Sequence, residues 1–235
     1  MYILEGNIGA GKSTFLKMLK KELSYLTIGL EPKNNWYEEI GGNSLLSQFY
    51  QKPKRWAYTL ETLTLFSRVN QHKTEQEQKN PFHVIERSIY SGNYCFAKNC
   101  YENGFLTEIE WKTYQKWFSF VATDICQLPH GFIYLRVDPT KCHERAKLRN
   151  RSSEKLMTIG YLKQIHQHHE NFLIEKNDIL ADLFTVPVLI LDAHADFEHN
   201  KTVFEKQCAA VEDFIIHTQA QMVREDGPYI SPRLE

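Results

Sequence analysis

The fold is decided by residues 2–23, which read YILEGNIGAGKSTFLKMLKKEL. Residues 6–13 of this stretch match a phosphate-binding loop, GxxxxGK followed by Ser or Thr. The apolar run at 2–5 predicts a strand before the motif, and the apolar spacing after Lys12 predicts a helix behind it. A strand, such a loop and a helix in this order are typical of an α/β protein that binds a nucleoside triphosphate.

The residue types of this loop suit phosphate. Glycines let the backbone curl so that N–H groups point at phosphate oxygens, and the start of the helix adds partial positive charge. We expect Lys12 to reach the β- and γ-phosphates and the Ser13 hydroxyl to ligate Mg²⁺. The predicted binding loop for ATP, or for another triphosphate, consists of Gly6, Asn7, Ile8, Gly9, Ala10, Gly11, Lys12, Ser13 and Thr14.

Short apolar runs alternate with long helical patterns along the rest of the chain, and this alternation indicates a parallel sheet covered by helices. The predicted strands are 2–5, 27–31, 83–86, 131–137 and 186–191. The predicted helices are 12–24, 43–51, 53–79, 89–101, 108–126, 140–148, 159–181 and 200–219. No linker or repeat divides the chain, so we expect one domain over 1–235 with an extended polar tail at 224–235.

Composition narrows the class of protein. The chain has 235 residues, a formal net charge of −1 and 42% hydrophobic residues. The net charge disfavours a basic protein that binds nucleic-acid polymers, and the hydrophobic content disfavours a disordered chain. No apolar stretch is long enough to predict a membrane span. The five cysteines form no CxxC pair, and the N-terminus shows no targeting pattern. We therefore expect a soluble protein of the cytoplasm.

Charged residues follow two of the predicted strands, at the edge where ligands bind in such sheets. Glu31 stands before a proline at the end of the second strand, and Glu86-Arg87 end the third. Glu86 is expected to serve the Mg²⁺ ion together with Ser13, and Arg87 to neutralise phosphate charge. The alternative is a structural ion pair between Glu31 and Arg87.

Three arginines gather near the end of the predicted helix 140–148. Arg145 and Arg149 share a helical face, and Arg151 lies just beyond the helix. Arginines that fold over a transferring phosphoryl group stabilise its transition state, so we expect a lid over the triphosphate. A solvated helix end, where arginines complement the helix dipole, is the alternative.

With these motifs in this order, the sequence resembles the deoxynucleoside kinase family, which includes deoxycytidine, deoxyguanosine and insect multisubstrate kinases. The segments that carry the resemblance are EGNIGAGKST, EP followed by Trp36, KPKRW after Tyr50, ERSIYS, YLRVDPTKCHERAKLRNR, YLKQIHQHHENFL and VPVLILDAHADF. The resemblance implies a P-loop fold with a five-stranded parallel sheet, phosphoryl transfer from ATP to a nucleoside 5′-hydroxyl in nucleotide salvage, and a homodimer formed through long helices.

The resemblance also implies roles for single residues. Glu31 matches the general base toward the 5′-hydroxyl, and Arg87 matches the arginine that holds the 5′-oxygen and phosphate region. Tyr50 and Glu154 match residues that bind the sugar 3′-hydroxyl. The segment from Asp192 to Phe197 matches the loop that grips the donor base. The walls of the base pocket match Trp36, Phe49, Leu60 and Phe96.

Two of three base-reading positions depart from the family pattern: Glu61 stands in place of a glutamine and Gly92 in place of an aspartate, whereas Arg68 keeps the family's arginine. An ionised glutamate only accepts hydrogen bonds, and guanine presents two adjacent donors on its Watson–Crick edge. Arg68 is then able to serve O6 or N7, which favours deoxyguanosine. There are two alternatives. In the first, Glu61 pairs with Arg68 and the pocket is neutral; in the second, burial keeps Glu61 protonated, so that it behaves like a glutamine. Gly92 removes bulk, so we expect room for a larger base.

Two competing functions share parts of this pattern. A thymidylate-type monophosphate kinase also has the loop, the sheet and an arginine lid, but Tyr50 and Glu154 at the sugar position argue against it. A non-catalytic relative with the kinase fold would show eroded catalytic residues. Here Lys12, Glu31 and Arg87 are present, so we expect an active nucleoside kinase.

Overall fold

The computed structural model describes residues 1–32, 36, 39–40 and 43–226. Its centre is a parallel sheet of five strands in the order β2-β5-β1-β6-β7. The strands are β1 (Tyr2–Glu5), β2 (Thr27–Gly29), β5 (His83–Glu86), β6 (Gly131–Arg136) and β7 (Val188–Asp192). The predicted fold class is therefore confirmed. The second strand is shorter than expected, because its pairing with β5 ends at Gly29 opposite Ile85, and Glu31 lies in the loop beyond it.

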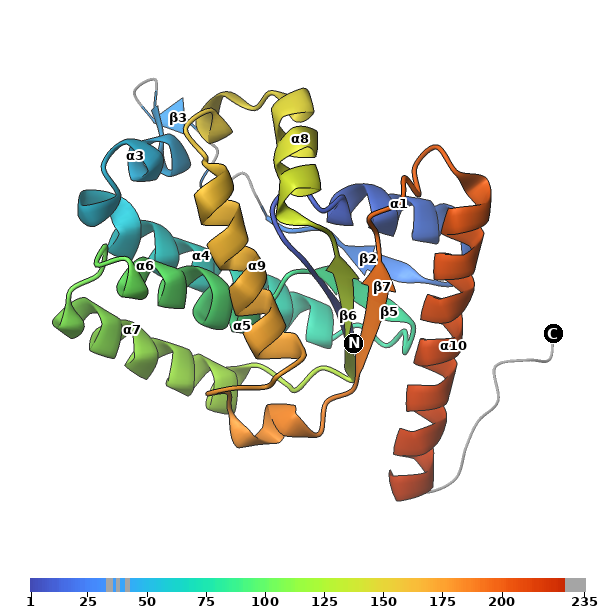
Figure 1. The fold of residues 1–235 in the computed structure, drawn as a ribbon. Coiled ribbons are helices and arrows are strands. Elements are labelled where there is room, and N and C mark those ends of the chain that lie inside the picture. The colour runs from blue at the N-terminus through green and yellow to red at the C-terminus, as the bar shows by residue number, and fades with distance from the viewer. Residues whose placement is uncertain (33–35, 37–38, 41–42, 227–235) are drawn as a thin grey trace.

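Helices cover both faces of this sheet, as Figure 1 shows. Helices α1 and α10 lie on one side, and α4, α7 and α9 lie on the other. The helical elements are α1 (Lys12–Glu22), α3 (Leu45–Gln51), α4 (Pro53–Gln76), α5 (Ile89–Ser91), η1 (Gly92–Ala97), α6 (Lys98–Glu102), α7 (Glu108–Phe120), η2 (Val121–Ile125), α8 (Pro139–Arg149), η3 (Ser152–Glu154), α9 (Ile159–Leu173), η4 (Ala181–Phe184) and α10 (Lys201–Asp226).

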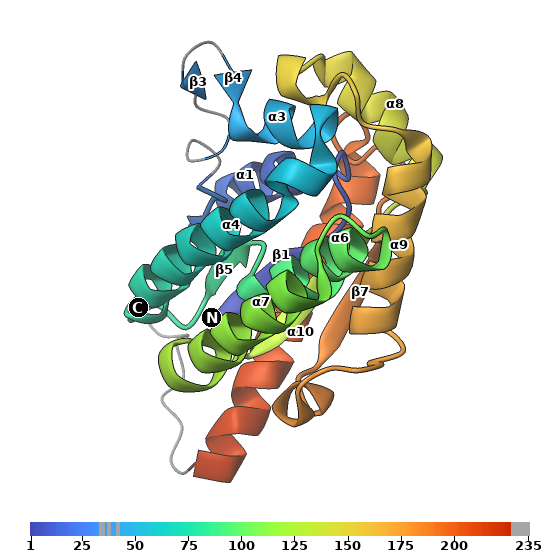
Figure 2. The ribbon, with the colours of Figure 1, turned by 90° about the vertical axis from the view of Figure 1, so that its left-hand side faces the viewer.

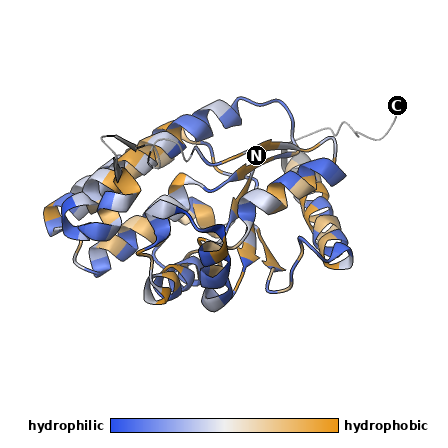
Figure 3. Ribbon diagram, turned by 90° about the horizontal axis from the view of Figure 1, so that it is seen from above, coloured by the Kyte–Doolittle hydropathy of each residue, from blue (hydrophilic) through white to orange (hydrophobic). Residues whose placement is uncertain are grey.

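The alternation of side chains along β1 builds the core on both faces. Tyr2 and Leu4 point into a cluster with α1 and α10, whereas Ile3 points into a second cluster with α4, α7 and α9. Figure 3 shows the strands coloured as hydrophobic and the helices with mixed faces, as expected for a sheet buried on both sides. The sheet is thus held rigidly enough to position the loops at its edge.

Some predicted boundaries are wrong. Helix α9 ends at Leu173 rather than at 181, because Lys176 and Asp178 adopt left-handed backbone angles, with φ of 53° and 52°. Helix α10 continues to Asp226, so 224–226 are helical and not part of an extended tail. The rest of that predicted tail, 227–235, lies outside the described residues. The helix predicted from 43 begins at Leu45, since Asn43–Ser44 form strand β4.

That strand belongs to a small antiparallel hairpin, β3 (Glu39–Ile40) with β4 (Asn43–Ser44), which the sequence did not predict. Strands of two residues carry no periodic signal to detect. Figure 2 shows the hairpin and α3 together above the end of α4. In the part of the chain that the structure describes, no helix combines the length and the apolar character that crossing a membrane requires.

Candidate active site

Backbone geometry fixes the phosphate-binding loop between β1 and α1. Gly9 has a φ of 80°, and a Cβ there would lie 2.2 Å from the carbonyl oxygen of Cys142. Gly11 has a φ of 95°, and a Cβ there would lie 2.8 Å from the ring of Phe197. Both positions therefore require glycine, for conformation and for space. The loop found from the motif has the predicted strand before it and the predicted helix behind it.

Side chains anchor the loop from inside. The Lys12 ammonium donates to the carbonyl oxygens of Gly6 and Asn7 at 3.0 and 2.8 Å. The Asn7 amide donates to the carbonyl oxygen of Leu162 on α9, at 2.8 Å. Ala10 is fully buried. Asn7 thus ties the loop to the helix opposite, an anchoring that the motif alone does not reveal.

The residues expected to hold Mg²⁺ meet at the first turn of α1. The Ser13 hydroxyl donates to both oxygens of the Glu86 carboxylate, at 2.9 and 2.8 Å. A hydroxyl and a carboxylate side by side are the oxygen ligands that Mg²⁺ takes when phosphates complete its shell. Groups of three or more His, Cys, Asp or Glu side chains that could hold a metal ion do not occur among the described residues. The donor set at Ser13 and Glu86 fits a phosphate-bound Mg²⁺.

Glu31 lies between two arginines. It accepts a hydrogen bond from Arg68 Nη2 at 2.9 Å, and Arg87 Nε lies 3.5 Å from the same carboxylate oxygen. All three side chains are buried to within a few per cent. The ion pair between Glu31 and Arg87, which the sequence offered as an alternative, is thus present. Arg68 lies closer to Glu31 than Arg87 does, and the sequence did not predict that contact.

At the far end of the site, Glu61 and Arg68 share one face of α4, but no hydrogen bond between them occurs within the described residues. The alternative in which Glu61 pairs with Arg68 therefore holds only as a charge interaction between the two groups, without a direct contact. Burial raises the pKa of Glu61 to about 7, although Arg68 and a Cys100 thiol 3.7 Å away act to lower it. Near pH 7, the Glu61 carboxyl is thus partly ionised, when it only accepts hydrogen bonds, and partly protonated, when it both donates and accepts like a glutamine.

The prediction that Gly92 leaves room for a larger base is wrong. A Cβ at this position would lie 2.8 Å from Arg68 Nη1, so the guanidinium occupies the space that the glycine leaves. Arg68 Nη1 and Nε are buried, and neither has a hydrogen-bond partner among the residues that the structure describes. Because a buried unpaired donor costs about 1–3 kcal/mol, these two groups are well suited to acceptors of a ligand.

The apolar walls surround this end. Trp36, Phe49, Leu60 and Phe96 are all buried and border the same cavity. The Phe96 ring lies beneath both guanidinium groups, with its centroid 4.6 Å from Arg87 Cζ and 5.6 Å from Arg68 Cζ. These cation–π contacts help to hold the two arginines at the cavity wall.

Glu154, one of the two predicted sugar-binding residues, contacts two of the predicted lid arginines. Its carboxylate accepts from Arg149 and from Arg151, and the ring of Tyr50 packs edge-on against Tyr161 at 6.0 Å. Arg145 lies apart from the other two arginines. It donates to the carbonyl oxygens of Ala10 and Ala193, both at 3.3 Å. The predicted convergence of three lid arginines therefore holds for two of them.

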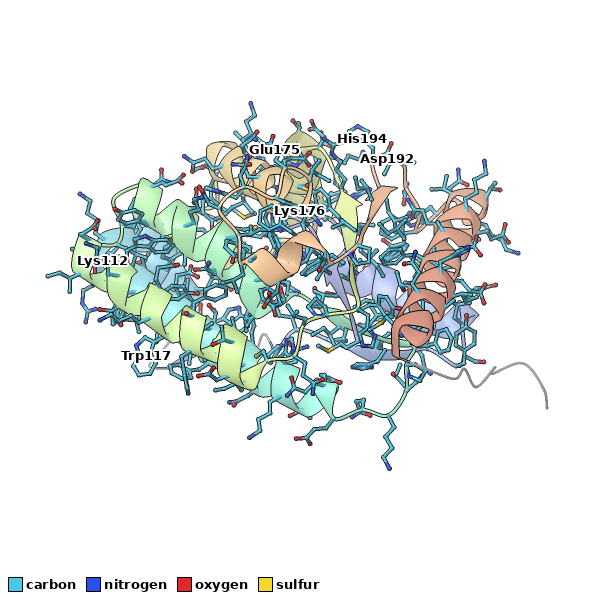
Figure 4. The ribbon with its side chains drawn as sticks, turned by 90° about the horizontal axis from the view of Figure 1, so that it is seen from below. Lys112, Trp117, Glu175, Lys176, Asp192 and His194 are labelled. Atoms are coloured by element: carbon cyan, nitrogen blue, oxygen red, sulfur yellow. The ribbon has the colours of Figure 1, made fainter. Side chains whose placement is uncertain are left out.

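Arg145 joins the phosphate-binding loop to the segment after β7. Its guanidinium lies 5.9 Å from the centroid of Phe197, which packs behind Gly11. Asp192 ends β7 at the surface, and Figure 4 shows Asp192 and His194 next to one another there. The predicted donor-base segment thus lies against the loop that receives the phosphates.

One cavity of about 310 Å³ runs from the phosphate-binding loop past Glu31 and Arg87 to Glu61 and Arg68. Of the predicted residues, its lining includes Ile8, Gly9, Gly11, Lys12, Ser13, Thr14, Glu31, Trp36, Phe49, Tyr50, Leu60, Glu61, Arg68, Glu86, Arg87, Phe96, Arg149, Arg151 and Glu154. Sequence reasoning missed Lys17, Leu46, Thr64 and Tyr161. Thr64 follows Glu61 by three residues on the same helical face, a spacing that predicts its position.

Comparison with known proteins identifies the family. The family model described as deoxynucleoside kinase matches residues 2–216. The chain is 35% identical to deoxycytidine kinase 2 of Gallus gallus, over 90% of this chain and 89% of that protein. It is 35% identical to the mitochondrial deoxyguanosine kinase of Xenopus laevis, over 90% and 88%, and 32% identical to deoxycytidine kinase of Homo sapiens, over 90% and 89%. With these matches over nearly its whole length, the chain belongs to the deoxynucleoside kinase family of phosphotransferases.

Proposed function

We propose that this kinase transfers the γ-phosphate of ATP to the 5′-hydroxyl of a deoxyribonucleoside in nucleotide salvage, with deoxyguanosine preferred. The observation that carries the proposal is the single cavity that runs from the phosphate-binding loop past Glu31 and Arg87 to Glu61 and Arg68. A triphosphate at one end and a nucleoside at the other would meet at Glu31.

At the centre of the cavity, Glu31 would accept the proton of the 5′-hydroxyl as that oxygen attacks the γ-phosphorus. Because such transition states are largely dissociative, positioning and charge neutralisation matter more than base strength. Arg87 lies 3.5 Å from Glu31 and would hold the 5′-oxygen and the transferring group. Lys12, Arg149 and Arg151 would neutralise the phosphate oxygens, and Arg145 with the segment from Asp192 to Phe197 would enclose the donor.

Mg²⁺ would be held by Ser13 and Glu86, whose hydroxyl and carboxylate already lie together. The ion would supply neutralisation of the negative charge on the phosphates. Tyr50 and Glu154 would bind the sugar 3′-hydroxyl. For Glu154 this contact would compete with its two arginine partners, so sugar binding and lid position would be linked.

At the base end, an ionised Glu61 would accept from guanine N1–H and the 2-amino group, since carboxylates only accept. The two unpaired donors of Arg68 would serve O6 or N7. Phe96 would stack on the base, a contact worth about 1–3 kcal/mol in comparable sites. A protonated Glu61 offers one donor and one acceptor, which suits cytosine or adenine instead.

We also propose a homodimer formed through α4 and α7. Phe66 on α4 and Trp117 and Phe120 on α7 are 45%, 44% and 50% exposed, and the Phe66 and Trp117 rings lie 6.2 Å apart. Figure 4 shows Trp117 on the outer side of α7. An apolar face of this kind suits a second copy of the chain. Sedimentation should give twice the 27.7 kDa of one chain, and Trp117→Glu should give a single chain.

The proposed function is tested by product identification with γ-labelled ATP and Mg²⁺. Label should appear in deoxynucleoside 5′-monophosphates when nucleosides are offered, and not in diphosphates when monophosphates are offered. Label only in diphosphates would assign a monophosphate kinase, and no transfer to any acceptor would assign a non-catalytic relative. Either result would overturn the proposal.

A further inference from the structure

Glu5, the last residue of β1, is a buried carboxylate outside the proposed catalytic and binding residues. It is fully buried and does not line the cavity. Its Oε1 accepts a hydrogen bond from the Ser88 hydroxyl at 2.6 Å. Ser88 also accepts from the backbone N–H groups of Tyr90 and Ser91, both at 3.2 Å, as the N-cap of α5. The direction of the Ser88 hydroxyl is therefore fixed, and with it one oxygen of Glu5.

The other oxygen faces Arg87. Glu5 Oε2 lies 4.0 Å from Arg87 Nη1, and neither atom has a hydrogen-bond partner of ordinary geometry among the described residues, although the nearby Ser91 side chain also acts to lower the pKa of Glu5. The backbone of Arg87 is itself constrained, with a φ of 66° and its N–H donated to the carbonyl oxygen of Leu4 at 3.0 Å. A non-glycine residue in the left-handed region is uncommon and persists only where its surroundings enforce it.

Four charges follow one another through this buried region, in the order Glu5, Arg87, Glu31 and Arg68. Their side chains are 0%, 4%, 7% and 6% exposed. Two carboxylates and two guanidinium groups balance, which is the condition under which buried charges are tolerated. Burial raises the pKa of Glu5, and the adjacent Arg87 opposes that rise. Without Glu5, the carboxylate left beside Arg87 among the described residues would be Glu31, which it shares with Arg68.

We propose that Glu5 is a positioning residue for Arg87. It holds the guanidinium from the side opposite Glu31, so that the two carboxylates together fix where Arg87 presents its donors. Glu5 itself touches neither the nucleoside nor the triphosphate and acts only through Arg87. The proposal rests on the proposed function, in which Arg87 holds the 5′-oxygen and the transferring group.

A double-mutant cycle tests this role with Glu5→Gln, Arg87→Lys and the double variant, each measured for kcat and for nucleoside KM. Gln keeps the length of Glu and can still accept from Ser88, but it lacks the charge. Glu5→Gln should lower kcat about 10- to 100-fold and change KM less than about threefold, as expected for coupled neighbours. In the double variant, kcat should equal that of Arg87→Lys alone.

Glu170→Gln is the matched control. Glu170 is a buried carboxylate that pairs with Arg136 away from the cavity. Its loss should leave kcat within about threefold, which separates the Glu5 effect from the general effect of removing a buried charge. Should Glu5→Gln fail to fold, Ser88→Ala takes its place, because it frees Glu5 Oε1. It should lower kcat severalfold and add nothing to Arg87→Lys.

Additive effects on kcat, or a wild-type kcat for Glu5→Gln, would overturn the proposal. A wild-type kcat for Arg87→Lys would instead overturn the proposed role of Arg87, so the two failures are distinguishable. An equal loss of kcat in Glu170→Gln would likewise contradict a role specific to Glu5.

Discussion

The two ends of the cavity are built by different means. At the phosphate end, the binding loop lies within residues 6–14 and backbone shape positions it, as the glycine contacts of Gly9 and Gly11 show, although Glu86 and the arginines around it come from other elements. At the base end, Glu61, Arg68 and Gly92 are distant in sequence from Glu31, and buried charges position them. The phosphate end is therefore a property of local chain geometry, and the base end is a property of side-chain pairing across the fold.

This difference has a consequence for function. A loop shaped by its backbone presents the same N–H groups whatever surrounds it, so its chemistry is common to many proteins. A pocket shaped by paired charges changes with a single substitution, as Gly92 illustrates by admitting the Arg68 guanidinium. We expect changes near the phosphates to affect all nucleosides alike and changes near the base to alter their ratio.

The largest effect is expected for Glu31→Gln. Loss of a positioned base should lower kcat about 10²- to 10⁴-fold, with nucleoside binding nearly unchanged. Because the amide oxygen of Gln can still accept from Arg68, the loss should be similar for deoxyguanosine and deoxycytidine. Steady-state kinetics with both nucleosides checks this, and a kcat near wild type would remove Glu31 from the proposed role.

Glu61→Gln should raise the stability of the protein at high pH. The pKa of Glu61 is raised from 4.5 to about 7, so the folded state loses stability as pH rises between these values. Above pH 7, where Glu61 is ionised in the folded state, its burial lowers the free energy of unfolding by about 3 kcal/mol. The uncharged Gln side chain removes this loss of stability. Denaturant unfolding at pH 4.5 and 8 should show a gain only at pH 8. An equal gain at both values would contradict the buried-carboxylate account.

Gly92→Asp should alter base preference about tenfold. The new carboxylate would pair with Arg68 Nη1 and draw the guanidinium away from Glu31. The ratio of kcat/KM for deoxyguanosine over deoxycytidine should fall, and Gly92→Ala, which adds bulk without charge, controls for crowding. An equal change in both variants would assign the effect to volume rather than to pairing.

The ratio of kcat/KM for deoxyguanosine over deoxycytidine should also depend on pH, and this is the smallest of the expected effects. Between pH 6 and 8 a group with a pKa of about 7 goes from mostly protonated to mostly ionised. The wild-type preference for deoxyguanosine over deoxycytidine should therefore rise about fivefold, and in Glu61→Gln it should stay flat. A pH-dependent ratio that persists in the variant would place the titrating group elsewhere.

Much of the phosphate end could be predicted from the sequence, because its signals are local. The motif at 6–13, the flanking strand and helix, and the acidic strand end at Glu86 are set by spacings of a few residues. The five strands could be predicted for a similar reason, since strands buried on both faces read as short apolar runs, whereas their order in the sheet was not predicted.

The base end could not be predicted in the same way. The contact of Arg68 with Glu31 spans 37 positions, and its geometry depends on the absence of a side chain at Gly92. The raised pKa of Glu61 arises from burial, which composition cannot show. Likewise, Arg145 departs from Arg149 and Arg151 because backbone carbonyls of two loops bind it, a tertiary contact without a sequence signal.

The central claim is that Glu61 reads the base while the phosphate end supplies a chemistry common to all nucleosides. It is tested most directly by initial rates with Mg·ATP and deoxyguanosine, deoxyadenosine, deoxycytidine or thymidine, for wild type and Glu61→Gln in parallel. We predict that deoxyguanosine leads for the wild type and that its advantage over deoxycytidine is lost in the variant. A lead by any of the other three nucleosides, or an unchanged ratio in Glu61→Gln, would contradict the claim.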